Sequence, residues 1–158
     1  MTALCLFTAC FFFSQLYTTV GALPTSRVQT LGMRNVFQFA GLIRCVAPAS
    51  PLDYNGYGCY CGLGGSGTPV DASDSCCFDH DCCYGEAQNA GCNPYFQYYG
   101  YNCENGSASC AGYNGGCARM VCECDLQAAL CLQRSPYKSF FRRWPTESCT
   151  GSSPPCHK

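Results

Sequence analysis

The sequence has few charged residues and no excess of basic ones. Only 12% of its 158 residues are charged, and nine lysines and arginines stand against ten aspartates and glutamates. A protein that binds nucleic acid through its phosphates needs a basic patch, because release of counterions drives that binding. No basic stripe is present, so nucleic acid is excluded as an expected partner.

Several motifs are missing as well. No Gly-x-Ser-x-Gly sequence occurs, which argues against the nucleophile elbow of serine hydrolases. The alternating acidic residues of an EF-hand are absent, and so are the acidic repeats and low-complexity tracts of a structural matrix protein. Beyond the N-terminal segment, no apolar run reaches the roughly 20 residues of a membrane span.

The N-terminal segment has the pattern of a secretion signal. Residues 4–13 are almost wholly apolar, and the small residues Val20, Gly21 and Ala22 follow in the spacing that signal peptidase accepts. The apolar run is short for a membrane span, so an anchor is the weaker alternative. We therefore predict a signal peptide at 1–22 and a secreted, extracellular protein.

A short polar stretch at 23–34 has no core-forming periodicity and predicts a propeptide. Arg34 would fit the acidic pocket of a trypsin-like protease, which we expect as the activating partner. A disordered N-terminal arm is the alternative. Without Arg27 and Arg34, seven basic residues remain against ten acidic ones, and we expect 35–158 to form the functional domain.

Cysteine is abundant. Of 18 cysteines, Cys5 and Cys10 fall in the predicted signal, which leaves an even number in 35–158. Cysteine at this density in a secreted chain indicates disulfides, which stabilise a small domain with a limited core. Adjacent pairs such as Cys76 and Cys77 do not match zinc-finger spacings, so a zinc cluster is the weaker alternative.

A short amphipathic helix is expected at the start of this domain. Asn35 is suited to cap it, and Phe37 falls off the apolar stripe and is expected to face outward. The stripe has the i, i+3, i+4, i+7 spacing of one helical face. Its members are Val36, Phe39, Ala40 and Ile43.

The region after this helix is rich in turn-forming residues. Proline, asparagine and glycine punctuate 48–67, which predicts connected turns. Asp71, Ser73 and Asp74 can each cap the helix that we expect at 75–89.

A second long helix is expected at about 117–132. Both long helices carry two cysteines seven residues apart, about 10 Å along the axis. These are Cys76 and Cys83 on the first helix, and Cys124 and Cys131 on the second. Bridges made in reversed order would lock the helices antiparallel and bring Asp125 near His80, although spacing alone leaves the connectivity open.

A small β-hairpin is expected between the two long helices. Tyr99, Tyr101 and Cys103 alternate with smaller residues, and Asn105-Gly106 is a strong two-residue turn signal. Residues 105–107 also form a glycosylation sequon on this exposed turn. The sequence leaves open whether the sequon carries a sugar or serves only as a turn.

The richest chemical pattern is a histidine beside a carboxylate, after a glycine-rich loop. His80 and Asp81 are adjacent, and the loop spans 60–67. A neutral imidazole can take a proton from water near physiological pH. A carboxylate and the free carbonyls of a glycine-rich loop can hold a hard cation such as Ca²⁺. The pattern therefore favours a calcium-assisted hydrolase.

These motifs resemble those of secreted phospholipase A2 of the pancreatic and elapid-venom group, over residues 35–149. Residues 60–69 are similar to the family's calcium loop, 77–83 to its catalytic helix and 124–129 to its second helix. The resemblance implies a mainly α, disulfide-rich fold. Its parts would be two long antiparallel helices cross-linked by disulfides, an N-terminal amphipathic helix, a calcium loop and a small β-hairpin.

The resemblance also implies the members of the site. His80 would be the base, Asp125 its orienting partner, and Tyr84 and Tyr99 phenols that bond this carboxylate. Tyr99 is chosen by its distance from Cys103, and Tyr98 and Tyr101 remain alternatives. The Ca²⁺ ligands would be the carbonyls of Tyr60, Gly62 and Gly64 and both carboxylate oxygens of Asp81.

The family's disulfide pairing maps onto seven bridges. They are Cys45 with Cys103, Cys59 with Cys149, Cys61 with Cys77, Cys76 with Cys131, Cys83 with Cys124, Cys92 with Cys117, and Cys110 with Cys122. The remaining Cys82 and Cys156 match the extra tail bridge of the group II enzymes. The chain also has no room after Cys92 for the insertion typical of pancreatic enzymes.

Apolar residues are expected to serve the substrate. The resemblance implies that seven apolar residues line an acyl channel, although such residues also fill any small core. They are Val36, Phe39, Ile43, Tyr54, Ala128, Ala129 and Leu132. Phe37 and Leu63 are candidates for insertion into a lipid surface. The aromatic segment 140–144 is either a second lipid anchor or a set of packed rings.

The expected function is that of a secreted, calcium-dependent phospholipase A2. It would act on phospholipid aggregates or membrane surfaces and hydrolyse the sn-2 ester to a fatty acid and a lysophospholipid. Lysine replaces the equivalent of Asp81 in inactive family members, so the carboxylate here favours activity. The alternative is a toxin or ligand that uses the same scaffold to bind a receptor or channel.

Overall fold

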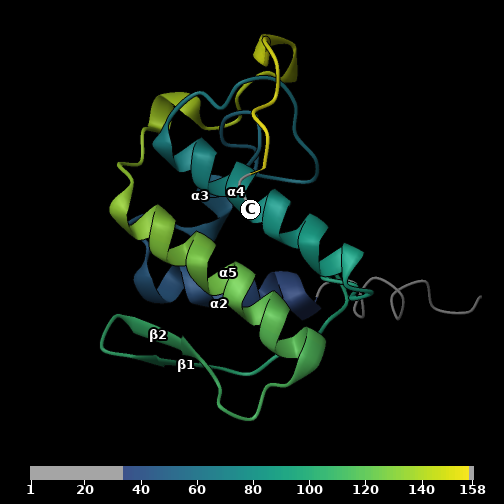
Figure 1. Ribbon diagram of the computed structural model, residues 1–158. Coiled ribbons are helices and arrows are strands. Elements are labelled where there is room, and N and C mark those ends of the chain that lie inside the picture. Colours follow the sequence, from purple (N-terminus) through teal and green to yellow (C-terminus); the bar gives the residue numbers. More distant parts are fainter. Residues whose placement is uncertain (1–33, 157–158) are drawn as a thin grey trace, which may run out of the picture.

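The computed structural model describes residues 34–156, and these form a mainly helical, disulfide-rich fold (Figure 1). The predicted signal peptide at 1–22 and the propeptide up to residue 33 lie outside the described residues. Arg34 is the first residue of helix α2. Within the described part of the chain, no helix is long and apolar enough to cross a membrane.

The elements confirm the predicted fold class. Three main helices enclose the core, and a two-stranded antiparallel hairpin lies at one edge. The helices are α2 (Arg34–Val46), α3 (Pro51–Tyr54), α4 (Ala72–Asn89) and α5 (Gly116–Arg134), and the strands are β1 (Tyr101–Glu104) and β2 (Ser107–Cys110). Two short 3₁₀ helices follow, η1 (Ser139–Phe141) and η2 (Thr146–Ser148).

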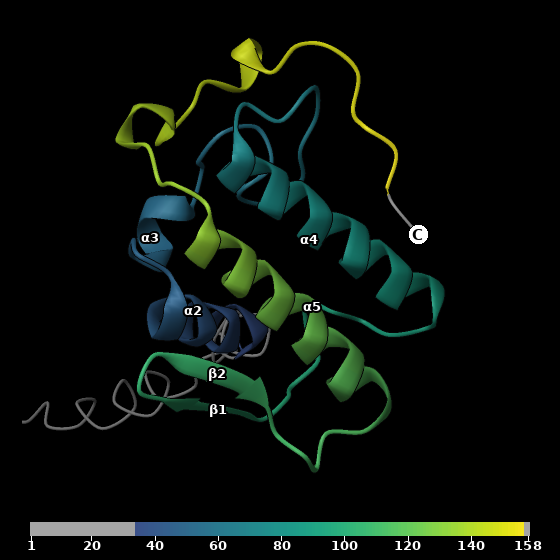
Figure 2. The same cartoon turned by 60° about the vertical axis from the view of Figure 1, so that its left-hand side comes forward.

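Helices α4 and α5 lie side by side at the centre of the molecule (Figure 2). Disulfides join Cys76 to Cys131 and Cys83 to Cys124. Because the cysteines pair in reversed order along the two helices, the helices run antiparallel, as predicted. These two bridges fix which faces of α4 and α5 meet.

All eight predicted disulfides are confirmed. Among them is the tail bridge between Cys82 and Cys156, which ties the C-terminal segment to α4. On its way, this segment crosses the glycine-rich loop, where the Thr68 N–H donates to the Thr150 carbonyl at 2.9 Å. The tail therefore covers the loop as well as ending on the central helix (Figure 1).

Helix α2 forms where it was expected, but Asn35 does not cap it. The helix begins one residue earlier, and the buried Asn35 side chain donates to the Pro94 carbonyl and accepts from the Tyr84 hydroxyl. The apolar stripe also differs from the prediction, because Val36 is 56% exposed whereas Leu42 is fully buried. Tertiary hydrogen bonds have decided the orientation of the first turn.

A short helix interrupts the region predicted as connected turns. Helix α3 has Pro51 in its first turn, where proline's fixed φ is compatible with a helix. The Ser50 hydroxyl accepts from the Leu52 N–H and caps it. The prediction of turns throughout 48–67 is therefore wrong at this point, because proline punctuates a loop and also starts a helix.

The helix predicted at 75–89 begins earlier, at Ala72. Asp71 is its N-cap and accepts from the Asp74 N–H at 3.0 Å. Asp74 is fully buried and has another role, because it accepts from the backbone N–H groups of Cys59, Tyr60 and Val70. The start of α4 is thereby joined to the glycine-rich loop.

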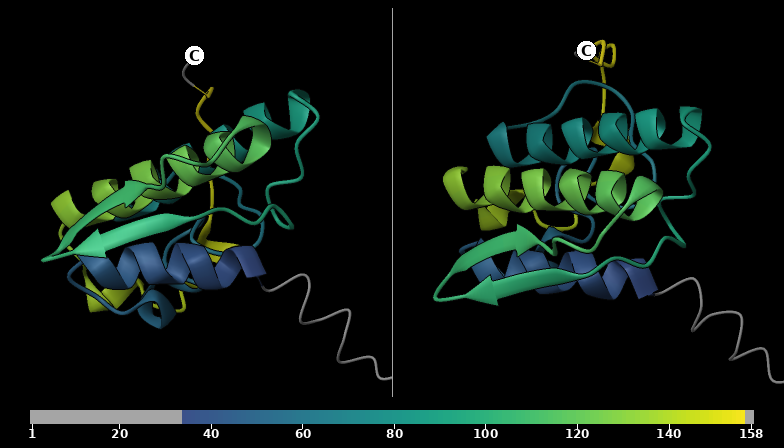
Figure 3. Two further views of the ribbon diagram at one scale, coloured as in Figure 1. Left: turned by 90° about the horizontal axis from the view of Figure 1, so that it is seen from below. Right: turned by 60° about the horizontal axis from the view of Figure 1, so that its bottom comes forward.

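The predicted hairpin is confirmed with its turn at Asn105-Gly106. Both residues have positive φ, 51° and 76°, as a type I′ turn requires. Cys103 pairs with Ala108 in the antiparallel register, and both strands pack against α2 (Figure 3). Tyr99 lies just before β1 and is buried, so it belongs to the core and not to the hairpin.

Candidate active site

The centre of the site is a histidine–carboxylate pair that bridges α4 and α5. The Nε2 atom of His80 lies 2.6 Å from Oδ1 of Asp125. The Asp125 side chain is fully buried, whereas that of His80 is 11% exposed. Since an ionised carboxylate only accepts hydrogen bonds, Nε2 carries the proton in this pair. That tautomer leaves Nδ1 of His80 free to accept a proton.

Two tyrosines complete the surroundings of the Asp125 carboxylate. The Tyr84 hydroxyl donates to Oδ1 at 2.7 Å, and the Tyr99 hydroxyl donates to Oδ2. Burial and the neighbouring carboxylate raise the pKa of both phenols well above its usual value, so they remain donors. These contacts select Tyr99 over Tyr98, which is exposed, and Tyr101.

The His80 ring is held by aromatic packing. The Phe39 ring of α2 stacks on it, with centroids 4.4 Å apart and planes 20° apart. The Tyr84 ring lies 4.2 Å away, centroid to centroid. The imidazole is therefore fixed by one short hydrogen bond and by two aromatic neighbours, which limits the orientations of its free nitrogen.

The carboxylate of Asp81 follows His80 on α4, one helical turn after Cys77, which bridges to the glycine-rich loop. Burial raises the pKa of Asp81 to about 6, while the charge of His80 lowers it and that of Asp74 raises it. A carboxylate that is desolvated in this way is stabilised by a nearby cation. The burial of Asp81 thus fits the role of a metal ligand.

The glycine-rich loop has a shape that larger residues would disturb. Gly64 has a φ of +73°, which a residue with a side chain rarely adopts. A Cβ added to Gly65 would come within 2.2 Å of the Tyr60 ring. The disulfide between Cys61 and Cys77 fastens the loop to α4, close to Asp81. The loop is therefore a defined backbone structure.

The residues fit a Ca²⁺ site that uses mainly backbone ligands. Carbonyl and carboxylate oxygens are the ligands that Ca²⁺ prefers, and Tyr60, Gly62, Gly64 and Asp81 offer that set. Across residues 34–156, no three His, Cys, Asp or Glu side chains gather as a metal-binding cluster. The expected site does not need such a cluster, since its only side-chain ligand is Asp81.

Asp74 is a supporting residue whose role the sequence did not indicate. It was expected only as a possible cap of α4, but its carboxylate binds the N–H groups of Cys59 and Tyr60, both at 2.8 Å. These bonds fix the peptide units that lead into the proposed ligand carbonyls. The only signal in the sequence was an acidic residue near the start of a helix, which many proteins have.

The phospholipase A2 profile matches residues 36–142, which is more than half of the chain. The chain belongs to the phospholipase A2 family. This confirms the resemblance that the sequence motifs suggested. His80, Asp81, Asp125 and the glycine-rich loop all lie within the matched region.

Curated phospholipase A2 relatives are similar along most of the chain. Acidic phospholipase A2 3 of Naja sagittifera is 52% identical over 105 residues, or 65% of this chain and 83% of the relative. Group 10 secretory phospholipase A2 of Homo sapiens is 40% identical over 136 residues, or 86% and 82%. The basic phospholipase A2 beta-bungarotoxin A1 chain of Bungarus flaviceps flaviceps is 51% identical over 105 residues, or 65% and 72%.

The apolar residues of this phospholipase A2 fall into two groups. Phe37 is 61% exposed and Leu63 is 91% exposed, so both can reach an external surface. Ile43 is buried, and Phe39 is half-buried against His80. Val36, expected in the acyl channel, lies with the exposed group.

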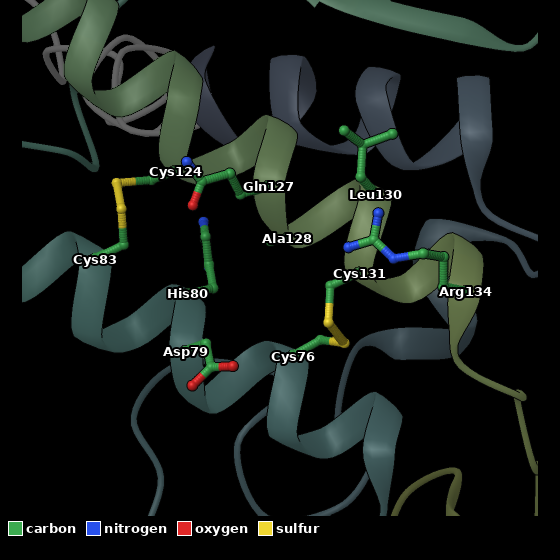
Figure 4. Close-up of a pocket in the computed structure, with 10 residues that line it drawn as sticks. All are labelled: Cys76, Asp79, His80, Cys83, Cys124, Gln127, Ala128, Leu130, Cys131 and Arg134. Atoms are coloured by element: carbon green, nitrogen blue, oxygen red, sulfur yellow. A yellow bond between two sulfur atoms is a disulfide. The ribbon is translucent and has the colours of Figure 1, made fainter. Parts of the chain in front are cut away.

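A groove that the sequence did not indicate lies between α4 and α5 (Figure 4). Its volume is about 400 Å³. His80 and Ala128 lie near its middle, and the two interhelical disulfides lie toward its ends. Ala128 was expected in the acyl channel and lines this groove instead. The sequence placed these residues on facing helices, but whether their side chains fill the space between the helices depends on tertiary packing.

Proposed function

We propose that this chain is a secreted, calcium-dependent phospholipase A2 that hydrolyses the sn-2 ester of glycerophospholipids. The products are a free fatty acid and a lysophospholipid. The observation that carries the proposal is the His80–Asp125 pair, held by Tyr84 and Tyr99 and adjacent to Asp81. Family membership and the absence of a Gly-x-Ser-x-Gly motif support hydrolysis by an activated water.

His80 is the general base in this reaction. Its Nδ1 takes a proton from the attacking water, and the charge that forms on the ring is stabilised by Asp125 at 2.6 Å from Nε2. The proton then passes to the departing lysophospholipid oxygen. Because two tyrosines and burial hold Asp125 in place, the ring does not need to reorient during the reaction.

The negative charge on the ester oxygen needs a second stabilising group. Bound Ca²⁺ would supply positive charge there as a Lewis acid. Gly62 contributes its backbone N–H to the same oxygen, and Asp81 would be the side-chain ligand that holds the ion. The hydrogen bonds of Asp74 keep the loop in shape before substrate binds.

The substrate comes from a phospholipid aggregate or membrane surface, to which the protein binds reversibly. Phe37 and Leu63 enter the lipid, and full burial of one such side chain contributes roughly 1.5–3 kcal/mol. Phe39 and Ile43 line the acyl channel behind them. Val36 lies on the exposed turn of α2 beside Phe37 and belongs to the mouth of this channel.

The chain is secreted after loss of residues 1–22 and activated by a trypsin-like protease after Arg34. The disulfides and the secretory relative support an extracellular location. Asn35 would become the new N-terminus, and its side chain already bonds Tyr84, a donor to Asp125. Cleavage at Arg34 therefore acts on a residue that is connected to the site.

The alternative is a receptor- or channel-binding toxin or ligand on the same scaffold. The similarity to a beta-bungarotoxin A1 chain is the observation that supports this alternative. We expect His80→Gln to abolish hydrolysis while it leaves the fold intact. If the biological effects of the protein survive this change undiminished, binding and not hydrolysis is the function.

One assay tests the enzymatic proposal. Fatty-acid release from phosphatidylcholine vesicles is measured with Ca²⁺ and with a chelator, for chains that begin at Leu23 and at Asn35. We expect release that the chelator removes, with the faster rate for the chain that begins at Asn35. The enzymatic proposal is wrong if neither chain shows chelator-sensitive release.

A further inference from the structure

The groove between α4 and α5 reaches His80 without contact with Val36, Phe39 or Ile43, the α2 residues expected in the acyl channel. The two interhelical disulfides stand on either side of His80, seven residues apart on each helix, or about 10 Å (Figure 4). Across from His80 lies Ala128, whose small side chain leaves space between the helices. Since the bridges fix the helix pair at two points, the groove is a permanent feature of this face.

The groove opens away from α2. Figure 4 looks into it with α5 in front of α2, so α2 lies behind the helix pair. Val36 and Phe37, the exposed apolar residues expected at the lipid surface, are on α2. A lipid surface bound at that end of α2 therefore leaves the groove facing water.

The rim of the groove carries three polar residues and Leu130, and the interior is apolar apart from the His80 ring. Asp79 on α4 and Gln127 and Arg134 on α5 are exposed at the rim. The groove itself is lined by cystines and Ala128 and ends on the His80 ring. The opposite approach to this ring is covered by the stacked Phe39 ring. The imidazole thus lies between the Phe39 ring and the surface groove.

We propose that this groove is a solvent-side route by which bulk water reaches the catalytic imidazole while the opposite face lies on lipid. The inference rests on the proposed function. Each turnover consumes one water, whose hydroxyl goes to the acyl carbon and whose proton goes to the lysophospholipid oxygen. When lipid covers the mouth of the acyl channel, phospholipid enters there and bulk water does not. The water that replaces the consumed one then enters through the groove.

Two tryptophan variants of α5 test the route. Gln127→Trp places an indole at the rim, and Gln133→Trp places one on the same helix outside the groove, at another exposed position. We expect Gln127→Trp to lower turnover on tightly bound vesicles about tenfold and turnover of a monomeric short-chain phospholipid by less than about twofold. Gln133→Trp should match the wild type on both substrates.

Three other results of this experiment would overturn the water route, and a fourth would overturn the proposed function. Equal losses on both substrates would show that the indole disturbs His80, and no loss on vesicles would show that water enters elsewhere; either result overturns the route. Equal losses on vesicles in both variants point to impaired lipid binding and also overturn it. A wild type without release from any substrate refutes the proposed function instead.

A chemical measurement tests the route without hydrolysis. Diethyl pyrocarbonate acylates a free imidazole nitrogen, with loss of ethyl carbonate, and peptide mass spectrometry locates the product at His80. For protein bound to ether-phospholipid vesicles, we expect His80 modification to continue in the wild type and in Gln133→Trp and to slow in Gln127→Trp. Full protection of the wild type by the vesicles would contradict the proposal.

A separate observation concerns the tip of the hairpin. Asn105, Gly106 and Ser107 are all exposed, and the first two have the positive φ values of a tight turn. The turn lies near the Cys45 carbonyl, toward the C-terminal end of α2, whereas Phe37 lies toward the other end. A bulky group at this turn would therefore leave the lipid-binding end of α2 free.

We propose that Asn105 carries an N-linked glycan when the chain passes through a eukaryotic secretory pathway. The Asn105 side-chain nitrogen loses a proton and replaces the lipid diphosphate at the anomeric carbon of the donor oligosaccharide. We expect a mass shift that peptide N-glycosidase removes and that Asn105→Gln or Ser107→Ala abolishes. Asn102→Gln, on the same hairpin outside the sequon, should keep it. A wild-type chain secreted without a glycan overturns this proposal.

Discussion

At the residue scale, the contacts of Asp125 connect it to the His80 ring and not to the surface that would bind lipid. Its carboxylate has three hydrogen-bond partners, His80, Tyr84 and Tyr99, and no exposed surface. An exposed carboxylate could serve many purposes, but the burial and the partners of Asp125 fit the proposed role of orienting and stabilising the imidazole. Changes at Asp125 should therefore act on rate and not on the affinity for lipid.

We predict that Asp125→Asn lowers kcat by about 10²–10⁴-fold with little change in vesicle binding. The amide cannot stabilise the imidazolium, and it can select the wrong tautomer of His80. Steady-state kinetics on vesicles, together with a sedimentation assay of binding, measures both quantities. A loss confined to vesicle binding would contradict the role given to Asp125.

The Tyr99 hydroxyl contributes stability through a buried hydrogen bond. We predict that Tyr99→Phe lowers the free energy of unfolding by about 1–3 kcal/mol, because one oxygen of Asp125 loses its donor. Denaturant titration measures the change. Tyr98→Phe is the matched control, since Tyr98 is exposed, and it should have no measurable effect.

The ionisation of Asp81 should make the stabilising effect of Ca²⁺ depend on pH. Its pKa is raised from 3.8 to about 6, so without Ca²⁺ the folded state holds this proton more strongly than the unfolded state. The stability that this proton gives is fully present below the unfolded pKa and is lost as the pH rises through about 6. Because Ca²⁺ binds the ionised form, its stabilising effect must increase over the same range.

We therefore predict that Ca²⁺ raises the Tm more at about pH 7.5 than at about pH 5. Thermal unfolding with Ca²⁺ and with a chelator at both values measures the difference. Asp81→Asn should lose most of the calcium effect at both. An equal calcium shift at the two pH values in the wild type would contradict the role of Asp81 as ligand.

At the element scale, the glycine-rich loop depends on its connections to α4. Asp74 binds the N–H of Tyr60 in the loop and those of Cys59 and Val70 on either side of it. Cys77 anchors the loop through Cys61. The sequence identified this loop from its glycines, because they mark backbone that adopts unusual φ or comes close to other atoms. It did not identify Asp74, because a carboxylate at a helix start is also an ordinary cap.

We predict that Asp74→Asn weakens Ca²⁺ binding about tenfold or more, since second-layer hydrogen bonds orient metal ligands. The amide can accept fewer of the loop's hydrogen bonds than the carboxylate does. Calorimetric titration with Ca²⁺ measures the affinity. Asp79→Asn, an exposed change on the same helix, is the control and should bind Ca²⁺ like the wild type.

At the scale of the whole molecule, two disulfides fasten the C-terminal tail, Cys59 with Cys149 and Cys82 with Cys156. The bridge between Cys82 and Cys156 joins residues that are 74 positions apart in the sequence. The bridge itself does not join α4 to α5. In the chain-entropy description, a loop of this length contributes roughly 4 kcal/mol, mainly by restricting the unfolded state. Stability and site geometry should respond separately to its removal.

We predict that replacing both Cys82 and Cys156 by alanine lowers the free energy of unfolding by about 2–4 kcal/mol. Because the helix pair stays joined by two other bridges, Ca²⁺ affinity and kcat should change less than threefold. Denaturant titration and vesicle hydrolysis measure the two effects. Loss of Ca²⁺ binding in this variant would show that the tail also shapes the loop.

The sequence by itself determined the order of the main elements and the number and spacing of the cysteines, and it indicated the residues of the proposed site. Helical periodicity, turn residues and motif spacing are local properties, so they can be read without knowing which segments meet. This is why the two long helices, the hairpin at Asn105 and the His80–Asp81 motif were predicted.

Only the tertiary structure decided what surrounds those residues. Asn35, expected as a helix cap, is a buried partner of Tyr84, and Val36, expected in the core stripe, is exposed. The Asp74 carboxylate binds the N–H of Tyr60 in the glycine-rich loop. A groove lies beside His80. Each outcome depends on atoms from distant segments that compete for the same space or hydrogen bond. No pattern within one segment records that competition.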